Sequence, residues 1–142
     1  MSVSTGKINT FLFFKLPSAW WSGVRLKYMD DTKAVASVKH RWANQNPFNS
    51  MFWAVQGMAA ELSTGALMID KIQKSGKKVS MLVVSNSATF TKKATGKITF
   101  TCLDGNLIDD ALEKTIATGE GQTVPMKSEG VNEDGVVVST FT

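Results

Sequence analysis

The segment from Met51 to about Lys74 constrains the fold of this chain more than any other part of the sequence. It is too long for a strand, contains no proline and is apolar nearly all round as far as Ile69, which predicts a helix. A helix on the protein surface shows a polar face, so a helix of this composition must be enclosed by other structure. Ser50 is the expected N-cap of this helix, and Gly76 is the expected C-terminal stop.

The remaining chain has patterns that can supply this enclosure. Alternating apolar and polar residues predict strands over Gly23–Tyr28 and Lys33–Trp42, with Asp30-Asp31 as the turn between them. In the second strand, Ala34, Ala36, Val38 and Trp42 fall on one side. Further strands are predicted over residues 79–91, 97–103, 122–129 and 136–141, and further helices over 5–16 and 107–118. The β-branched segment Val79–Thr91 is long enough to be a central strand.

The order of these elements predicts a fold class. The chain of 142 residues is about one domain long, so a single domain over residues 1–142 is expected. Strands separated by one hydrophobic helix, without strict alternation of strand and helix, indicate an α+β domain with a mainly antiparallel sheet. A sheet that buries such a helix must be strongly curved.

Composition excludes several classes of protein. Cys102 is the sole cysteine, so no intramolecular disulfide can form, no metal site is expected, and a reducing, cytoplasmic location fits. The net charge of +4 favours anionic partners, but the basic residues are scattered and match no nucleic-acid-binding motif, so no nucleic acid is expected. A membrane is not expected as a partner either, because a charged residue, Glu61, interrupts the long apolar segment.

Glu61 is the first candidate for a catalytic residue. Between Trp42 and Ile69 it is the one side chain that is charged at neutral pH. A carboxylate enclosed by apolar residues tends to have a raised pKa, which suits a general base near neutral pH. The alternative is structural: Glu61 could lie on a wet strip of the helix beside Gln56, or form an ion pair with Arg41 or Lys92.

The segment Asn46–Gly65 (NPFNSMFWAVQGMAAELSTG) resembles the signature of hotdog-fold acyl-CoA thioesterases of the phenylacetic-acid-degradation type. That family has an asparagine, a short glycine-containing turn, His-Gly-Gly and then a helix of small residues with an acid fifteen residues after the asparagine. Asn46 and Glu61 have this spacing. Where the family has His-Gly-Gly, this chain has Phe52-Trp53-Ala54, and Asn49 stands in place of a turn glycine.

The resemblance implies a hotdog fold, a curved sheet wrapped around one long central helix, and an activity. Backbone N–H groups near Phe52 and Trp53, in the first turn of the helix, would stabilise the oxyanion formed from a thioester carbonyl. Glu61 would activate water or attack the carbonyl directly, and Asn46 would orient the water. By its residue type alone, Asn46 could equally be a turn former before Pro47.

The resemblance also implies a homodimer or a dimer of dimers, because the family's site lies where the helix of one protomer meets a strand of another. Lys92 and Lys93 are then candidates to bind the phosphates of coenzyme A, which enters as part of the substrate. No separate cofactor is expected. The alternative for both lysines is a solvated strand end. Trp20 and Trp21 could line an acyl channel or belong to the core.

Two other functions are the alternatives to thioester hydrolysis. A hotdog dehydratase needs a histidine that works with the acid, and the sole histidine, His40, falls in a predicted strand away from that position. A single histidine so placed also disfavours a Ser-His-Asp or Cys-His site. A non-catalytic acyl-binding or regulatory module, which would keep the apolar tunnel without needing Glu61, is the alternative from a different class.

Overall fold

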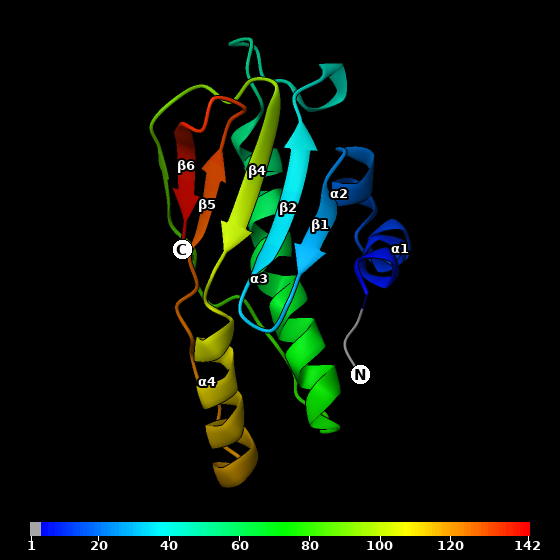
Figure 1. Cartoon of the computed structure of the whole chain (residues 1–142), viewed down its shortest axis with the longest axis vertical. Helices are drawn as coiled ribbons and strands as arrows, with labels where there is room; N and C mark the ends of the chain where they lie inside the picture. The colour runs from blue at the N-terminus through cyan, green and yellow to red at the C-terminus, as the bar shows by residue number, and fades with distance from the viewer. Residues whose placement is uncertain (1–3) are drawn as a thin grey trace.

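The helix predicted from Met51 to Lys74 is present as α3 (Trp53–Ser75), and a six-stranded sheet covers it along one side (Figure 1). This computed structural model describes residues 4–142. All strand pairs are antiparallel and the strand order is β1-β2-β4-β5-β6-β3. The strands are β1 (Arg25–Met29), β2 (Ala34–Lys39), β3 (Ala88–Phe90), β4 (Lys97–Cys102), β5 (Ser128–Val131) and β6 (Val137–Phe141).

The other helices lie around this central arrangement. They are α1 (Thr5–Lys15), α2 (Pro17–Trp21) and α4 (Gly105–Thr118), with a 3-10 turn at Trp42–Asn44. The helices α1 and α2 stand beside β1 at one edge of the sheet, and α4 extends from one end of it (Figure 1). The expected α+β hotdog architecture, a curved antiparallel sheet around a long helix, is confirmed.

The core lies between α3 and the sheet, and its close packing explains why position 130 is a glycine. Phe100 on β4 is the largest fully buried side chain, and its ring lies directly over Gly130 on β5. A Cβ atom at position 130 would come within 2.5 Å of that ring. The Phe141 ring contacts Phe100 edge to face, with centroids 6.0 Å apart, and lies against Gly57 of α3. Small residues at 57 and 130 therefore let helix and sheet approach each other.

The predicted C-terminal end of α3 is confirmed, and the predicted N-terminal end is not. Gly76 is the C-cap, in the left-handed conformation that glycine tolerates best, with φ of 68°. The prediction of Ser50 as the N-cap is wrong. The N-cap is Phe52, which offers no side-chain acceptor, because the Ser50 hydroxyl is engaged with Asn46 in the preceding loop.

The predicted central strand Val79–Thr91 is at the edge of the sheet instead. Only Ala88–Phe90 forms β3, which pairs with β6 on one side and with no described strand on the other. Residues 79–87 belong to no helix or strand and are largely exposed, including Met81, Leu82, Val83 and Val84. A β-branched composition indicates a residue suited to a pleated surface and does not indicate whether a strand is central.

Three smaller predictions also need correction. The strand expected over Gln122–Glu129 begins only at Ser128, as β5. Pro17 does more than end the first helix, since it occupies the first position of α2, where its missing N–H costs nothing. Trp42, predicted to end the second strand on the same side as Ala34, Ala36 and Val38, lies after β2 in the 3-10 turn and is exposed.

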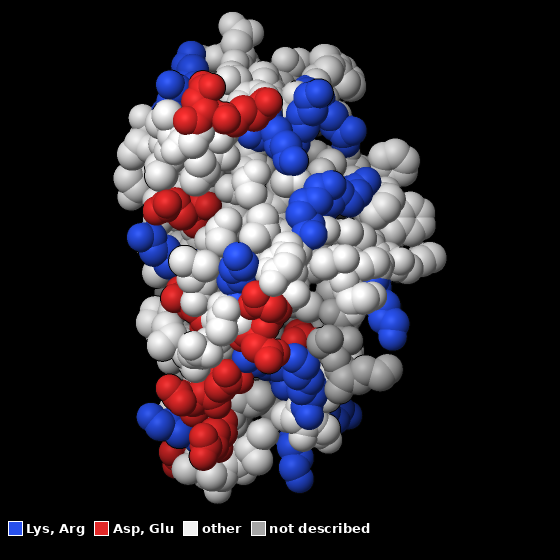
Figure 2. Space-filling model, in the orientation of Figure 1, with Lys and Arg blue, Asp and Glu red and all other residues white. Residues whose placement is uncertain are grey.

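Charges are unevenly distributed over the fold. Two ion pairs join the C-terminal half of α3 to its neighbours: Lys71 to Asp109 of α4, and Lys74 to Asp31 of the β1–β2 turn, at 2.9 and 2.6 Å. On the face shown in Figure 2, acidic side chains gather over α4. Within residues 4–142, no helix is both long and apolar enough to cross a membrane, and no three potential ligand side chains cluster as a metal site would need.

Candidate functional site

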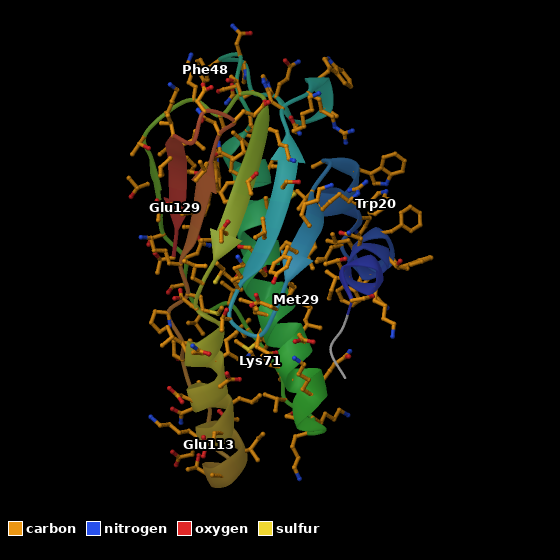
Figure 3. The ribbon with its side chains drawn as sticks, in the orientation of Figure 1. Trp20, Met29, Phe48, Lys71, Glu113 and Glu129 are labelled. Atoms are coloured by element: carbon orange, nitrogen blue, oxygen red, sulfur yellow. The ribbon has the colours of Figure 1, made fainter. Side chains whose placement is uncertain are left out.

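A cavity of about 500 Å³ opens at the N-terminal end of α3. Figure 3 shows Phe48, one of its lining residues, at the end of the molecule opposite Lys71 and Glu113. The lining combines the loop before α3, the first turn of α3 and the segment that follows β3. It consists of Asn46, Pro47, Phe48, Ser50, Met51, Phe52, Trp53, Gln56, Phe90, Lys92, Lys93 and Ala94. Five of the six site residues predicted from sequence therefore lie around one cavity.

Asn46 holds the loop in front of α3 in shape. Its side-chain oxygen accepts from the backbone N–H of Phe48 at 2.8 Å, and its side-chain nitrogen donates to the Ser50 hydroxyl at 3.0 Å. This bracing fits the tight turn at Asn49, whose φ of 61° lies in the left-handed region. Because its carboxamide is engaged on both sides, Asn46 has the geometry of the turn former.

The first turn of α3 offers backbone donors, but not all of those expected. The Phe52 N–H, predicted to be unpaired, donates to the carbonyl of Asn44 at 2.9 Å. Among the described residues, no hydrogen bond from the Trp53 or Ala54 N–H is found. These amides occupy the first two helical positions, where no carbonyl of the helix can reach them and where the positive end of the helix dipole lies.

Both candidate lysines lie at the rim of the cavity. Lys92 and Lys93 are exposed, and the ammonium group of Lys93 donates to the carbonyl of Phe48 at 3.0 Å. This contact ties the segment after β3 to the loop before α3 across the cavity. The two lysines thus place positive charge beside an apolar space.

Gln56 is a site residue that the sequence did not reveal. Its side chain is buried, 4% exposed, and lines the cavity one turn into α3. The side-chain nitrogen donates to the carbonyl of Met51 at 3.3 Å, while the side-chain oxygen has no partner among the described residues. Buried acceptors are rarely left unpaired, so this oxygen is suited to accept a hydrogen bond from a bound molecule. The sequence contained one signal, an isolated glutamine in the apolar helix.

Glu61 is not where the sequence argument placed it. The expectation that it is enclosed is wrong for the single chain, because its side chain is exposed and does not line the cavity. Glu61 lies five positions after Gln56, a rotation of about 140° around the helix, so the two side chains leave α3 on different parts of its surface. It also lies eight residues after Trp53, about 12 Å further along the axis.

The face of α3 that carries Glu61 is nonetheless not a typical solvent-facing surface. Its neighbours one turn away on each side are Gly57, Met58, Thr64 and Gly65, all partly exposed. None of these is charged, whereas the outer face of a surface helix is normally polar. A Cβ atom added at Gly65 would meet nothing within 4 Å. This face of the helix is open and mostly apolar.

The other residues singled out from sequence lie away from the cavity. His40 follows β2, where its backbone N–H donates to Gly96. Trp20 and Trp21 lie on α2, at the edge of the sheet far from β3, and do not line the cavity. Arg41, a possible partner of Glu61, bonds the carbonyl of Trp21 instead.

Comparisons with known proteins agree with this architecture. A family profile described as a domain of unknown function (DUF4442) matches residues 5–142. A comparison with curated protein sequences finds no match.

Solved structures are similar over nearly the whole chain. One is a protein of unknown function from Pseudomonas aeruginosa, described as a probable thioesterase, with a TM-score of 0.84, 20% identity and coverage of 99% of this chain and 93% of that one. A thioesterase from Haemophilus influenzae has a TM-score of 0.71 and 10% identity, with coverage of 99% of this chain and 87% of that one. The PaaI protein from the phenylacetic acid degradation operon of E. coli has a TM-score of 0.62 and 13% identity, with coverage of 96% of this chain and 93% of that one. Similarity at these identities establishes the shared fold.

Proposed function

Because the chain belongs to the DUF4442 family and folds as a hotdog domain, we propose that it hydrolyses acyl thioesters, with coenzyme A or a carrier protein as the thiol. The observation that carries this proposal is the cavity at the N-terminus of α3. One of its lining residues is Trp53, whose backbone N–H has no hydrogen-bond partner in the described part of the chain, and apolar walls and two lysines lie beside it. Thioesterases occur among the proteins that share this fold.

In the proposed reaction the thioester carbonyl binds at the first turn of α3. Its oxygen accepts from the Trp53 and Ala54 N–H groups, which stabilise the negative charge that forms when water adds to the carbonyl carbon. Gln56 accepts a hydrogen bond from the attacking water. Collapse of the tetrahedral intermediate breaks the carbon–sulfur bond and releases the thiolate and the acid. Asn46 acts indirectly, by holding the loop that forms the cavity wall.

We further propose that the base is Glu61 from a second copy of the chain, because Glu61 of the same chain lies too far along the helix. The edge strand β3 and the exposed apolar residues 81–84 before it are suited to pair with the same segment of a partner. Such pairing extends the sheet and covers the open face of α3. In the resulting homodimer, Lys92 and Lys93 at the cavity rim bind the phosphates of coenzyme A.

A mixing experiment tests the shared site. Asn46→Ala and Glu61→Gln variants, each inactive alone, are unfolded together, refolded as mixed dimers and assayed for release of free thiol from acyl-CoAs. If one site takes its residues from two chains, mixed dimers recover part of the parental activity. Parental hydrolysis that Glu61→Gln leaves unchanged contradicts the role of Glu61.

The dimer is tested separately by light scattering. Val84→Lys places a charge within the exposed apolar segment and is expected to convert a dimer into monomers. Lys78→Glu, at an exposed position outside that segment, is the control and leaves the mass unchanged. A monomeric parent protein would contradict the pairing.

A non-catalytic acyl-binding module is the second candidate function. The exposure of Glu61 in the single chain and the absence of the family's His-Gly-Gly favour it. Tight binding of acyl-CoA without thiol release, by both the parent and Glu61→Gln, would support this function over hydrolysis.

A further inference from the structure

We propose that α1 and α2 form a docking surface for anionic lipid bilayers. The surface is an aromatic patch that consists of Phe11, Phe13, Phe14, Trp20 and Trp21. This inference goes beyond the proposed reaction and does not depend on it. It departs from the expectation, drawn from the sequence, that no membrane is a partner.

The helix α1 is apolar on two sides. Ile8 and Leu12, one turn apart, are buried against the rest of the protein. Phe11 and Phe14 on the same helix are exposed, Phe14 to 71%. A helix that needed only to cover the sheet would have a polar outer face. The outer phenylalanines therefore indicate that a second apolar surface covers α1.

Aromatic side chains of the two helices contact one another. The Phe13 ring contacts Phe14 and Trp20 edge to face, with centroids 5.0 and 5.4 Å apart. Trp21, the next residue on α2, is 69% exposed. Figure 3 shows Trp20 where α2 adjoins α1. Exposed apolar patches of this kind mark binding surfaces for proteins or membranes.

The charges around the patch select the kind of partner. Residues 1–29 contain four basic residues and no acidic residue, so this segment carries the whole formal net charge of +4. Lys7 and Lys15 on α1 are exposed, and the guanidinium of Arg25 lies 3.4 Å from the centre of the Trp20 ring. On the face shown in Figure 2, the surface over α1 and α2 shows basic and uncharged atoms but no acidic ones.

Aromatic rings beside basic side chains match the chemistry of an anionic bilayer surface. Tryptophan and phenylalanine enter the boundary between head groups and acyl chains, while lysine and arginine remain at the level of the anionic head groups. A second copy of the chain fits less well, because pairing two such patches would bring together surfaces that are both basic. The lipid surface satisfies both the apolar and the electrostatic requirement.

The experiment is cosedimentation of the full-length chain with vesicles. Vesicles of phosphatidylcholine alone are compared with vesicles in which about a third of the lipid is phosphatidylglycerol. We expect binding to the anionic vesicles that weakens as salt is raised. Phe14→Ser with Trp21→Ser is expected to reduce this binding at least tenfold, because both side chains are mostly exposed and their loss leaves the fold intact. Lys7→Glu with Lys15→Glu is expected to reduce it by a similar factor.

Matched controls lie outside the patch. Leu103→Ser and Lys114→Glu change an exposed apolar and an exposed basic residue elsewhere and are expected to leave binding unchanged. Absence of binding to anionic vesicles overturns the proposal, as does binding that neither double variant weakens. If Phe14→Ser with Trp21→Ser instead lowers the mass of the protein in light scattering, the patch is an interface between copies, and the lipid proposal is also overturned.

Discussion

Replacing Gln56 by methionine tests whether the unpaired oxygen in the cavity is kept for a ligand. Methionine has a similar volume and no hydrogen-bonding requirement, so the substitution removes the buried acceptor without opening a void. We expect the protein to become more stable and its proposed hydrolysis to become slower. This combination is expected of a residue that lowers the stability of the free protein but binds the substrate.

The magnitude follows from the contacts of Gln56. An unsatisfied buried acceptor costs about 1–3 kcal/mol, and the substitution removes that cost. It also removes the hydrogen bond to Met51, which at 3.3 Å contributes about 0.5–1 kcal/mol. The carbonyl of Met51 keeps a second donor, the side-chain nitrogen of Asn46. The free energy of unfolding should therefore rise by about 1 kcal/mol.

The assay is urea unfolding followed by tryptophan fluorescence, at one protein concentration because subunit pairing would add to the apparent stability. Gln73→Met, at an exposed position of α3, is the control and is expected to change stability by less than about 0.5 kcal/mol. If Gln56→Met lowers the free energy of unfolding by 1 kcal/mol or more, the oxygen has a partner in the free protein and the reasoning is refuted. If stability rises but thiol release is unchanged, the oxygen does not serve the reaction.

Two further predictions concern the core. Gly130→Ala should lower the free energy of unfolding in urea by about 2–3 kcal/mol, because the new methyl group meets the Phe100 ring. The control Gly121→Ala, in open surroundings, should change the free energy of unfolding by less than about 0.5 kcal/mol. Equal effects of the two substitutions would contradict the close packing. Burial raises the pKa of the Cys102 thiol to about 11, so the thiol should react with a disulfide reagent near neutral pH only after unfolding. The pKa of this thiol is higher in the folded state than its ordinary value of 9.0, so the stability that the buried thiol contributes is complete below pH 9 and is lost as pH rises towards 11. The difference in unfolding free energy between the parent protein and Cys102→Ala should therefore shrink over that range. A constant difference would contradict the raised pKa.

The candidate site could be predicted only in part, because some of its residues depend on contacts between segments that are far apart in the sequence. Asn46, Trp53 and the lysines at 92 and 93 belong to segments whose ends meet at one end of α3, and the family resemblance was enough to single them out. The Phe52 amide could not be assigned from sequence, because its acceptor, the carbonyl of Asn44, comes from the 3-10 turn that replaces the end of a predicted strand.

The sequence by itself determined where the long helix lies and that other structure must cover it. An apolar run without proline that ends at a glycine has few other solutions, and the alternating segments before it can form a hairpin only with their apolar residues inward.

Tertiary structure alone decided how α3 is rotated against the sheet. On a helix that is apolar all round, no contrast between faces fixes which residues turn inward, so Gln56 and Glu61 were equally eligible for burial. In the fold, Val55, Ala59 and Leu62 turn into the core, and this rotation buries the glutamine and exposes the glutamate. The same holds for residues 79–91, whose composition suits any strand and whose place at the edge depends on which strands pair beside it.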